Sequence, residues 1–358
     1  MKRLFVIVFI ALFLTSCRLT DFLDDETLPG DSGSFNIVSE APVYSYARSI
    51  YLDYPYLFVA DGNARLTIFD IMVPWSFNSV STVDLQSYVF DPIYDMARDS
   101  RNTLYAAMGE SGFYAFKTNT PYSVEIQNYK QDVHAISVSI DEGNYYGNLL
   151  AVCGKNFWKI YEIIGAGQVF ELSSQNFIYD RNYKKVFLSY PYLYLASDNE
   201  IDIYDISNPA NPSLINYEPA YNFKQMQIIG NRMIVMTNTN LIFYNISNPY
   251  ALVKLSSFAF NLYPTSFCFA EGNLIVAYSN KKIGHYTLTS QYNLNTISSI
   301  YLNYQVNDIK FHDGYYYLAC GEYGIVNMEI IADSILMDIV YSNNLQFINN
   351  TKKRFIKT

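Results

Sequence analysis

The chain has 358 residues, of which 50% are hydrophobic and 16% are charged, and its formal net charge is −9. This balance excludes an intrinsically disordered chain, and the acidic total argues against a nucleic-acid-binding protein, which normally carries a basic face. Aromatic residues reach 17%, with 35 Tyr and 24 Phe, and such residues favour half-buried β-strands.

The first residues have the pattern of a secretory signal. The basic pair Lys2-Arg3 precedes an unbroken apolar run over residues 4–14, which is too short to span a bilayer but suits the core of a signal peptide. The motif LTSC that ends at Cys17 resembles a bacterial lipobox. The resemblance implies cleavage before Cys17 and attachment of several acyl chains, palmitate among them, which would hold the protein on a membrane. The alternative is an ordinary signal peptide with a chance cysteine.

Composition divides the chain into four parts. Residues 1–16 are the expected lipoprotein signal peptide, and residues 17–34 hold the lipidated cysteine and an acidic stretch without periodicity, which predicts a flexible tether. Residues 35–345 contain the repeats described below, and residues 346–358 form a basic C-terminal tail. Arg18 rather than Asp follows the lipobox cysteine, which by analogy with enterobacterial sorting favours the outer membrane, on its periplasmic or its surface side.

Seven segments of similar pattern follow one another along the chain. Each combines an apolar strand, a small polar or Gly turn and a second strand with alternating apolar residues; a further strand often precedes and follows this pair. Four short strands at a period of 40–48 residues are typical of a β-propeller blade. An open β-solenoid and a pair of β-sandwiches are the alternatives. The segments begin at Tyr56, Leu104, Leu149, Tyr192, Arg232, Asn273 and Tyr315.

These units predict an all-β fold, a seven-bladed β-propeller, because a single blade cannot bury both of its faces alone. The closure of the ring has two candidates. FNIVSEAP at residues 35–42 is similar to the fourth strand of other units and would complete the last blade, and SILMDIVY at residues 334–341 would fill the same place.

The repeat also resembles a known family, the LVIVD repeat of bacterial surface lipoproteins. The similarity lies in IDIYDISNPANP at residues 201–212, in LIFYNISNP at 241–249 and, more weakly, in LTIFDIMVP at 66–74. Asn accepts local backbone hydrogen bonds and Pro fixes φ, so the Asn-Pro pairs predict turns. The resemblance implies a propeller in the cell envelope, and it brings no general catalytic set with it.

Cysteine and histidine spacing predicts no metal site and no cofactor, since the chain contains no CxxC or HxxxH motif. Cys153 and Cys320 occupy similar places in units three and seven, which are not neighbours in a ring, so we expect buried free thiols, with Cys268, rather than a disulfide. The histidines lie in three different units and are expected at the surface or in turns: His134, His285 and His312.

Residues at the start of the innermost strands would converge on one mouth of a central channel, where propellers commonly bind ligands. The predicted ring holds two acids, one Lys, one His and three neutral polar residues, which suits a polar ligand; the alternative is that strand starts at a wet channel are simply polar. The candidate ligand-binding residues are Ser49, Asp95, His134, Lys185, Gln225, Ser266 and Asp308.

Enzymatic functions have less support. Only two Trp residues are present, too few for the recurrent Trp motifs of quinone-dependent propellers, and there is no nucleophile elbow, phosphate loop or dinucleotide fingerprint. We therefore expect a membrane-anchored, non-enzymatic envelope propeller that binds a protein, peptide or glycan on one face of the ring. A scaffold subunit in outer-membrane or envelope assembly is one alternative, and a hydrolase or lyase using Asp95 and Asp308 at the channel mouth is another.

Overall fold

The computed structural model describes residues 34–331, apart from residues 63, 87, 88, 90, 121, 166, 179 and 180. The predicted signal peptide, all but the last residue of the tether and the basic tail lie outside the described residues. The described part consists of 28 strands, β1 to β28. Among the described residues, none forms a helix with the length and hydropathy of a membrane span.

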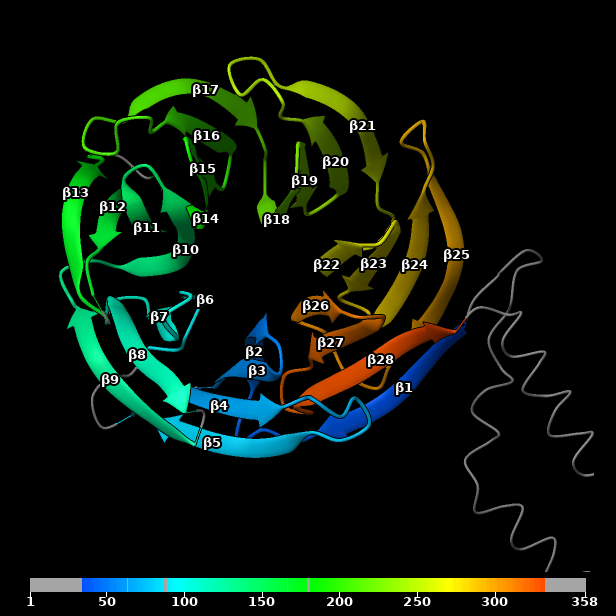
Figure 1. The fold of residues 1–358 in the computed structure, drawn as a ribbon. Coiled ribbons are helices and arrows are strands. Elements are labelled where there is room, and N and C mark those ends of the chain that lie inside the picture. The colour runs from blue at the N-terminus through cyan, green and yellow to red at the C-terminus, as the bar shows by residue number, and fades with distance from the viewer. Residues whose placement is uncertain are drawn as a thin grey trace, which may run out of the picture.

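The strands form seven antiparallel sheets of four strands each, arranged as blades around a common axis (Figure 1). The predicted all-β, seven-bladed propeller is confirmed, and each predicted strand pair forms the middle of a blade.

From the innermost to the outermost strand, the first three blades are composed as follows. Blade one consists of β2 (Ala47–Asp53), β3 (Tyr56–Asp61), β4 (Arg65–Asp70) and β5 (Asn78–Asp84). Blade two consists of β6 (Asp95–Arg98), β7 (Thr103–Ala107), β8 (Phe113–Thr120) and β9 (Ser123–Lys130). Blade three consists of β10 (Ala135–Asn144), β11 (Gly147–Gly154), β12 (Phe157–Ile163) and β13 (Val169–Asn176).

The next three blades repeat the same order. Blade four consists of β14 (Tyr183–Ser189), β15 (Tyr192–Ser197), β16 (Glu200–Asp205) and β17 (Ser213–Pro219). Blade five consists of β18 (Phe223–Ile229), β19 (Arg232–Thr237), β20 (Asn240–Asn245) and β21 (Val253–Ala259). Blade six consists of β22 (Pro264–Ala270), β23 (Asn273–Tyr278), β24 (Lys282–Leu288) and β25 (Leu294–Tyr301).

Blade seven closes the ring with strands from both ends of the described chain. Its inner strands are β26 (Asp308–His312), β27 (Tyr315–Ala319) and β28 (Ile325–Ile331), and its outermost strand is β1 (Ser34–Ala41), which pairs antiparallel with β28 (Figure 1, blue beside orange). The segment at residues 35–42 is therefore the one that completes the blade. The other candidate, residues 334–341, lies outside the described residues.

The hydrophobic core lies between the blades. Because side chains alternate along a strand, one face of each sheet contacts the preceding blade and the other face contacts the next. Between blades four and five, for example, Ile201 and Ile203 of β16 pack with Met226 of β18 and Val235 of β19. The middle strands are covered on both faces and are almost fully buried, as in β15.

The Asn-Pro segments form hydrogen-bonded turns, as predicted. Asp205 Oδ1 accepts a hydrogen bond from the Ser207 N–H at 2.8 Å, and Asn208 Oδ1 accepts one from the Ala210 N–H at 3.2 Å. The same bond recurs in blades one and five, where Asp70 Oδ1 accepts from the backbone at 2.8 Å and Asn245 Oδ1 at 2.9 Å.

The proline of each turn also joins its blade to the preceding one. Ser173 Oγ of blade three donates to the Pro209 carbonyl of blade four at 2.6 Å, and Asn216 Nδ2 of blade four donates to the Pro249 carbonyl of blade five at 3.2 Å. The Pro74 carbonyl of blade one accepts two such bonds from blade seven. The repeat motif thus contributes an inter-blade hydrogen bond as well as a turn.

One histidine prediction is wrong. His285 on β24 is only 3% exposed, and its Nε2 pairs with Asn273 Oδ1 at 2.8 Å. It faces Phe35 of the closing strand edge-to-face, at the register position that Ile203 occupies in blade four. Burial lowers the pKa of His285 to about 4. His134 and His312 are partly exposed, as expected.

The three thiols are free and buried, which confirms the expectation for Cys153, Cys268 and Cys320. The strand register shows that Cys153 and Cys320 are not equivalent. Cys153 pairs with the inner strand of its blade, whereas Ala319 does so in blade seven, one residue before Cys320.

Candidate functional site

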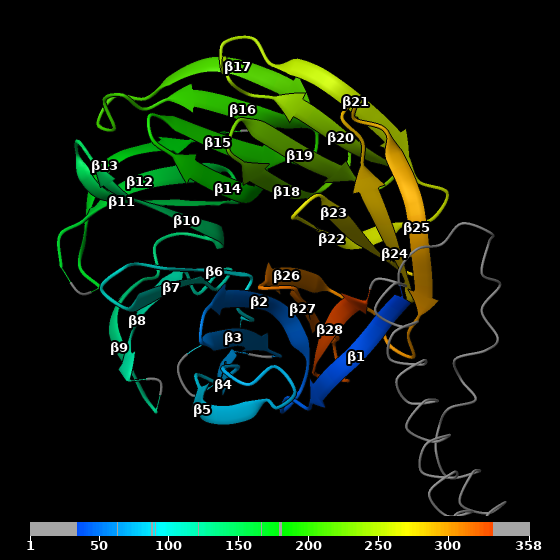
Figure 2. The same cartoon turned by 45° about the vertical axis from the view of Figure 1, so that its right-hand side comes forward.

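A cavity of about 1180 Å³ lies along the axis of the ring and is lined by residues of all seven blades. Its wall consists mainly of the innermost strands β2, β6, β10, β14, β18, β22 and β26, which face the axis (Figure 2). It is larger than the pockets of about 300–1000 Å³ that usually hold small ligands.

A β-bulge at the start of most inner strands defines the rim of this cavity. In β2, Ala47 pairs with Asp61 and Ser49 with Ala60, so that Arg48 is an extra residue between the two pairs. A bulge redirects the side chain of the extra residue, and such bulges are common beside functional sites. The register shifts in the same way at Ile136, Lys184, Lys224 and Thr265.

In the other two blades, Tyr94 and Asn307 precede β6 and β26 and donate backbone hydrogen bonds to Ala107 and Ala319 at 2.8 Å. All seven side chains line the cavity. We call them the mouth ring: Arg48, Tyr94, Ile136, Lys184, Lys224, Thr265 and Asn307.

The residues that follow the mouth ring form a second layer, the first channel ring. Each pairs with the end of the second strand of its blade. Six of the seven residues predicted from the sequence occupy this layer. In blade three the register position belongs to Ser137 rather than His134, because β10 begins only at Ala135, after His134, and Ser137 is the residue that pairs with Cys153. The first channel ring is Ser49, Asp95, Ser137, Lys185, Gln225, Ser266 and Asp308.

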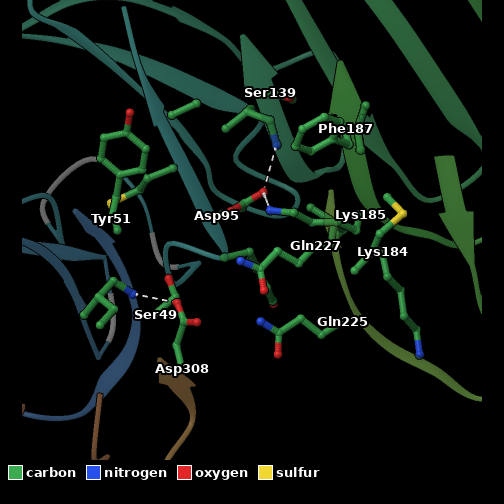
Figure 3. Close-up of a pocket in the computed structure, with 18 of the residues that line it drawn as sticks. Ser49, Tyr51, Asp95, Ser139, Lys184, Lys185, Phe187, Gln225, Gln227 and Asp308 are labelled. Atoms are coloured by element: carbon green, nitrogen blue, oxygen red, sulfur yellow. Dashed lines mark hydrogen bonds and ion pairs between the residues drawn. The ribbon is translucent and has the colours of Figure 1, made fainter. Parts of the chain in front are cut away.

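Most of this ring is engaged in joining blades to one another (Figure 3). Lys185 Nζ bonds Asp95 Oδ2 at 2.7 Å, and Asp95 also accepts hydrogen bonds from Ser137 Oγ and, at 3.3 Å, from the Val138 N–H. Asp308 Oδ2 accepts a hydrogen bond from the Ile50 N–H of blade one at 3.0 Å.

Glutamine side chains make the corresponding bonds between blades five and six. Gln225 Oε1 accepts from the Phe267 N–H at 2.8 Å and from Ser266 Oγ at 3.1 Å, while its Nε2 donates to the Phe267 carbonyl at 3.0 Å. Gln227 repeats the backbone bonds at Phe269. Each amide bonds the N–H and the carbonyl of one residue on β22, as the backbone of a paired strand would. These side chains therefore stabilise the contact between blades five and six.

The predicted residues differ in their access to the cavity. Ser49, Asp95, His134, Lys185, Gln225 and Asp308 line it, whereas Ser266 is only 1% exposed and does not. Deeper in the channel, Lys310 Nζ bonds Asp308 at 2.8 Å. Burial lowers the pKa of Lys310, but the adjacent Asp308 carboxylate and neighbouring groups outweigh this effect, so that its net pKa is raised.

The mouth ring itself was missed because bulges interrupt the alternation on which the strand pattern depends. The signal was present one residue earlier in several blades, where a Lys or Arg precedes the predicted residue. Within the described ranges, no group of three or more His, Cys, Asp and Glu side chains gathers at a place that could hold a metal ion.

Comparisons with known proteins agree with this architecture. The LVIVD-repeat family model matches residues 45–84 and 180–217, which contain two of the three segments noted in the sequence; the segment at 241–249 lies outside both matches. No curated protein sequence matches the chain.

Many solved structures match the chain in fold, among them the following two. A protein from Lactobacillus plantarum is 14% identical with a TM-score of 0.64, and the match covers 75% of this chain and 88% of that one. The β-propeller domain of Cps50 (Swd1) from Myceliophteria thermophila is 10% identical with a TM-score of 0.64, and the match covers 82% of this chain and 99% of that one. The chain is a seven-bladed β-propeller that carries LVIVD repeats.

Proposed function

We propose that the chain is a binding protein whose ligand site is the mouth of the central channel. The observation that carries this proposal is the mouth ring, whose residues lie around a cavity of about 1180 Å³. The first channel ring stabilises the fold, but the mouth ring retains side chains without such a role. Arg48 and Lys224 of the mouth ring, and Lys155, which also lines the cavity, have no carboxylate partner among the described residues.

The proposal is for binding without catalysis. Asp95 and Asp308 are the acids that a channel-mouth hydrolase would use, and each already holds a Lys ammonium and a backbone N–H. Because both carboxylates are occupied by these contacts, neither is free to act on a substrate as a general acid or base. The site therefore favours recognition of a protein, peptide or glycan over bond cleavage.

A binding assay with a blocked channel tests the proposal. Ile136 is a mouth-ring residue and lines the cavity, so Ile136→Trp should obstruct the opening. Leu214→Trp on outer strand β17, where Leu214 is 51% exposed, is the matched control. We expect hits from a glycan and peptide array to disappear with Ile136→Trp and to persist with the control. Hits that are unchanged by Ile136→Trp would refute a site at this mouth.

Membrane anchoring is part of the same proposal. The lipobox-like motif supports acylation of Cys17, and the acidic stretch after it supports a tethered propeller in the envelope of a bacterium, on the outer membrane. Labelling of cells with a palmitate analogue should mark the wild-type chain and not Cys17→Ser. Protease treatment of whole cells then distinguishes a surface position from a periplasmic one. A chain that stays unlabelled and soluble would contradict the anchor.

A scaffold role is the second candidate, and one observation favours it. The outer strands of blades three to six expose large apolar side chains, which is common at protein interfaces. If this surface holds an assembly partner, cross-linking in intact cells should recover one dominant protein, and Leu214→Glu with Val253→Glu should abolish its recovery. The side chains are Phe170 (60% exposed), Leu214 (51%), Tyr217 (60%), Val253 (56%) and Tyr301 (59%).

A further inference from the structure

Positive charge is concentrated at the channel of an otherwise acidic body. Between residues 34 and 331 the sequence holds 17 Lys or Arg and 26 Asp or Glu residues, a net charge of −9. The cavity is lined by seven Lys or Arg and four Asp or Glu residues, a net charge of +3. The net charge of the residues that line the channel is thus opposite in sign to the net charge of the protein around it. A concave site with charge of one sign attracts ligands of the opposite sign.

The cations of the mouth come from four blades. Lys155 follows β11 in blade three, next to Asn182, with which it forms an isolated β-bridge. Lys184 and Lys224 are the bulge residues of blades four and five, and Arg48 is that of blade one. Lys184 is bound to Asp198, while Lys155 and Lys224 have no acidic partner among the described residues.

Neutral groups complete the rim. The Arg48 guanidinium lies over the ring of Tyr94, 5.7 Å from its centroid, which leaves an aromatic surface beside the charge. Thr265 and Asn307 line the mouth from blades six and seven, but Thr265 Oγ1 donates to the Val306 carbonyl at 2.7 Å and Asn307 Nδ2 to the Ala47 carbonyl at 2.9 Å, so they offer a ligand mainly their oxygens as acceptors. Hydroxyl, amide and aromatic side chains bind sugars through hydrogen bonds and apolar contact, and separated lysines supply point charges for several separate anions.

The inner strands have little capacity to bind a peptide as an added strand. Strand addition requires unpaired backbone N–H groups at a sheet edge. The N–H groups of Val186 and Leu188 are bonded to Ser137 and Ser139 at 3.1 and 2.9 Å, and that of Phe267 is bonded to Gln225. A ligand in this channel is therefore recognised mainly through side chains.

We infer that the mouth ring, together with Lys155, binds an oligosaccharide that carries several carboxylates. The inference rests on the proposed function, since it names the ligand class of the same site. The carboxylates pair with Lys155, Lys224 and Arg48, and the sugar rings contact Tyr94 and the polar side chains between them. A ligand of several sugar units suits both the size of the cavity and the spread of the cations over four blades.

Calorimetric titration of the full chain with a galacturonate hexamer tests this inference. We expect binding that weakens as salt is raised, because exposed charge pairs are screened by ions. Each of Lys155→Glu and Lys224→Glu should weaken it about tenfold or more, since an attraction is replaced by a repulsion of similar size. The matched control Lys254→Glu, on outer strand β21 and without an acidic partner among the described residues, should leave the affinity unchanged.

Three further probes separate the possible failures. A neutral maltohexaose that binds at the mouth as tightly as the galacturonate would overturn the anionic ligand class and leave the proposed function standing. If polyglutamate or inorganic polyphosphate binds more tightly than the galacturonate hexamer, the inference that the ligand is a saccharide is wrong. If none of these probes and no member of the array binds in a manner sensitive to Ile136→Trp, the inference and the proposed function both fail.

Discussion

Removal of the Gln225 amide should destabilise the whole ring. Gln225→Ala leaves the N–H and the carbonyl of Phe267 without their partners, and Phe267 is 0% exposed. A buried polar group that loses its partner costs about 1–3 kcal/mol, and water in the channel can restore part of this. We expect the free energy of unfolding to fall by about 2–4 kcal/mol.

Urea unfolding followed by tryptophan fluorescence measures this loss. Gln225→Glu keeps the acceptor for the Phe267 N–H but loses the donor to its carbonyl, so its stability should lie between wild type and Gln225→Ala. Gln291→Ala, at an exposed glutamine whose side chain bonds to none of the described residues, is the control and should change stability by less than about 0.5 kcal/mol. If Gln225→Ala matches this control, the amide does not hold blades five and six together.

Three other properties follow from the described contacts. Ser173→Ala removes the hydrogen bond to the Pro209 carbonyl and should lower the free energy of unfolding by about 1 kcal/mol. Ser174→Ala, at the exposed serine next to it, is the control and should leave the free energy of unfolding unchanged. Equal effects of the two substitutions would refute the inter-blade role of the proline. Because the folded-state pKa of His285 is depressed to about 4 from 6.5, only the unfolded chain takes up this proton as pH falls. The contribution of His285 should therefore lower the free energy of unfolding between pH 6.5 and 4, by at most about 3 kcal/mol. This contribution should be absent in His285→Phe. An NMR titration that places the pKa of His285 in the folded chain near 6.5 would contradict the prediction. In the Cys17→Ser variant, a thiol reagent should label the native chain negligibly and the urea-unfolded chain fully. Burial raises the pKa of each of the three remaining thiols and shields it from the reagent. Rapid labelling of the native chain would contradict the burial of Cys153, Cys268 and Cys320.

The architecture was readable from the sequence because it is repeated. Strand alternation and turn residues recur at similar spacing, and each recurrence supports the others, so blade number and strand pairs were predicted correctly. Ring closure remained open, since two segments had suitable patterns. The structure selects residues 35–42 through pairing of β1 with β28, a long-range contact that local pattern does not encode.

The candidate site was only partly predictable. The alternation of apolar and polar residues located the first channel ring, apart from Ser137. It did not reveal that Gln225 and Asp308 bond to the neighbouring blade, because such contacts depend on the distance between sheets. The mouth ring was hidden for a different reason. A bulge adds one residue and redirects its side chain. The bulge residue is Lys or Arg in blades one, four and five but Ile136 and Thr265 in blades three and six, so residue type alone does not locate every bulge.

Site-specific photo-cross-linking tests the central claim most directly. A benzophenone side chain at position 136 would lie in the mouth ring, and the same side chain at position 214 would lie on the outer strand of blade four. In living cells, we predict that position 136 gives a cross-linked product whose yield falls when galacturonate hexamer is added. Position 214 should give no product that responds to the hexamer. Cross-links from position 214 alone would contradict a ligand site at the channel mouth and would favour the outer strands as the functional surface.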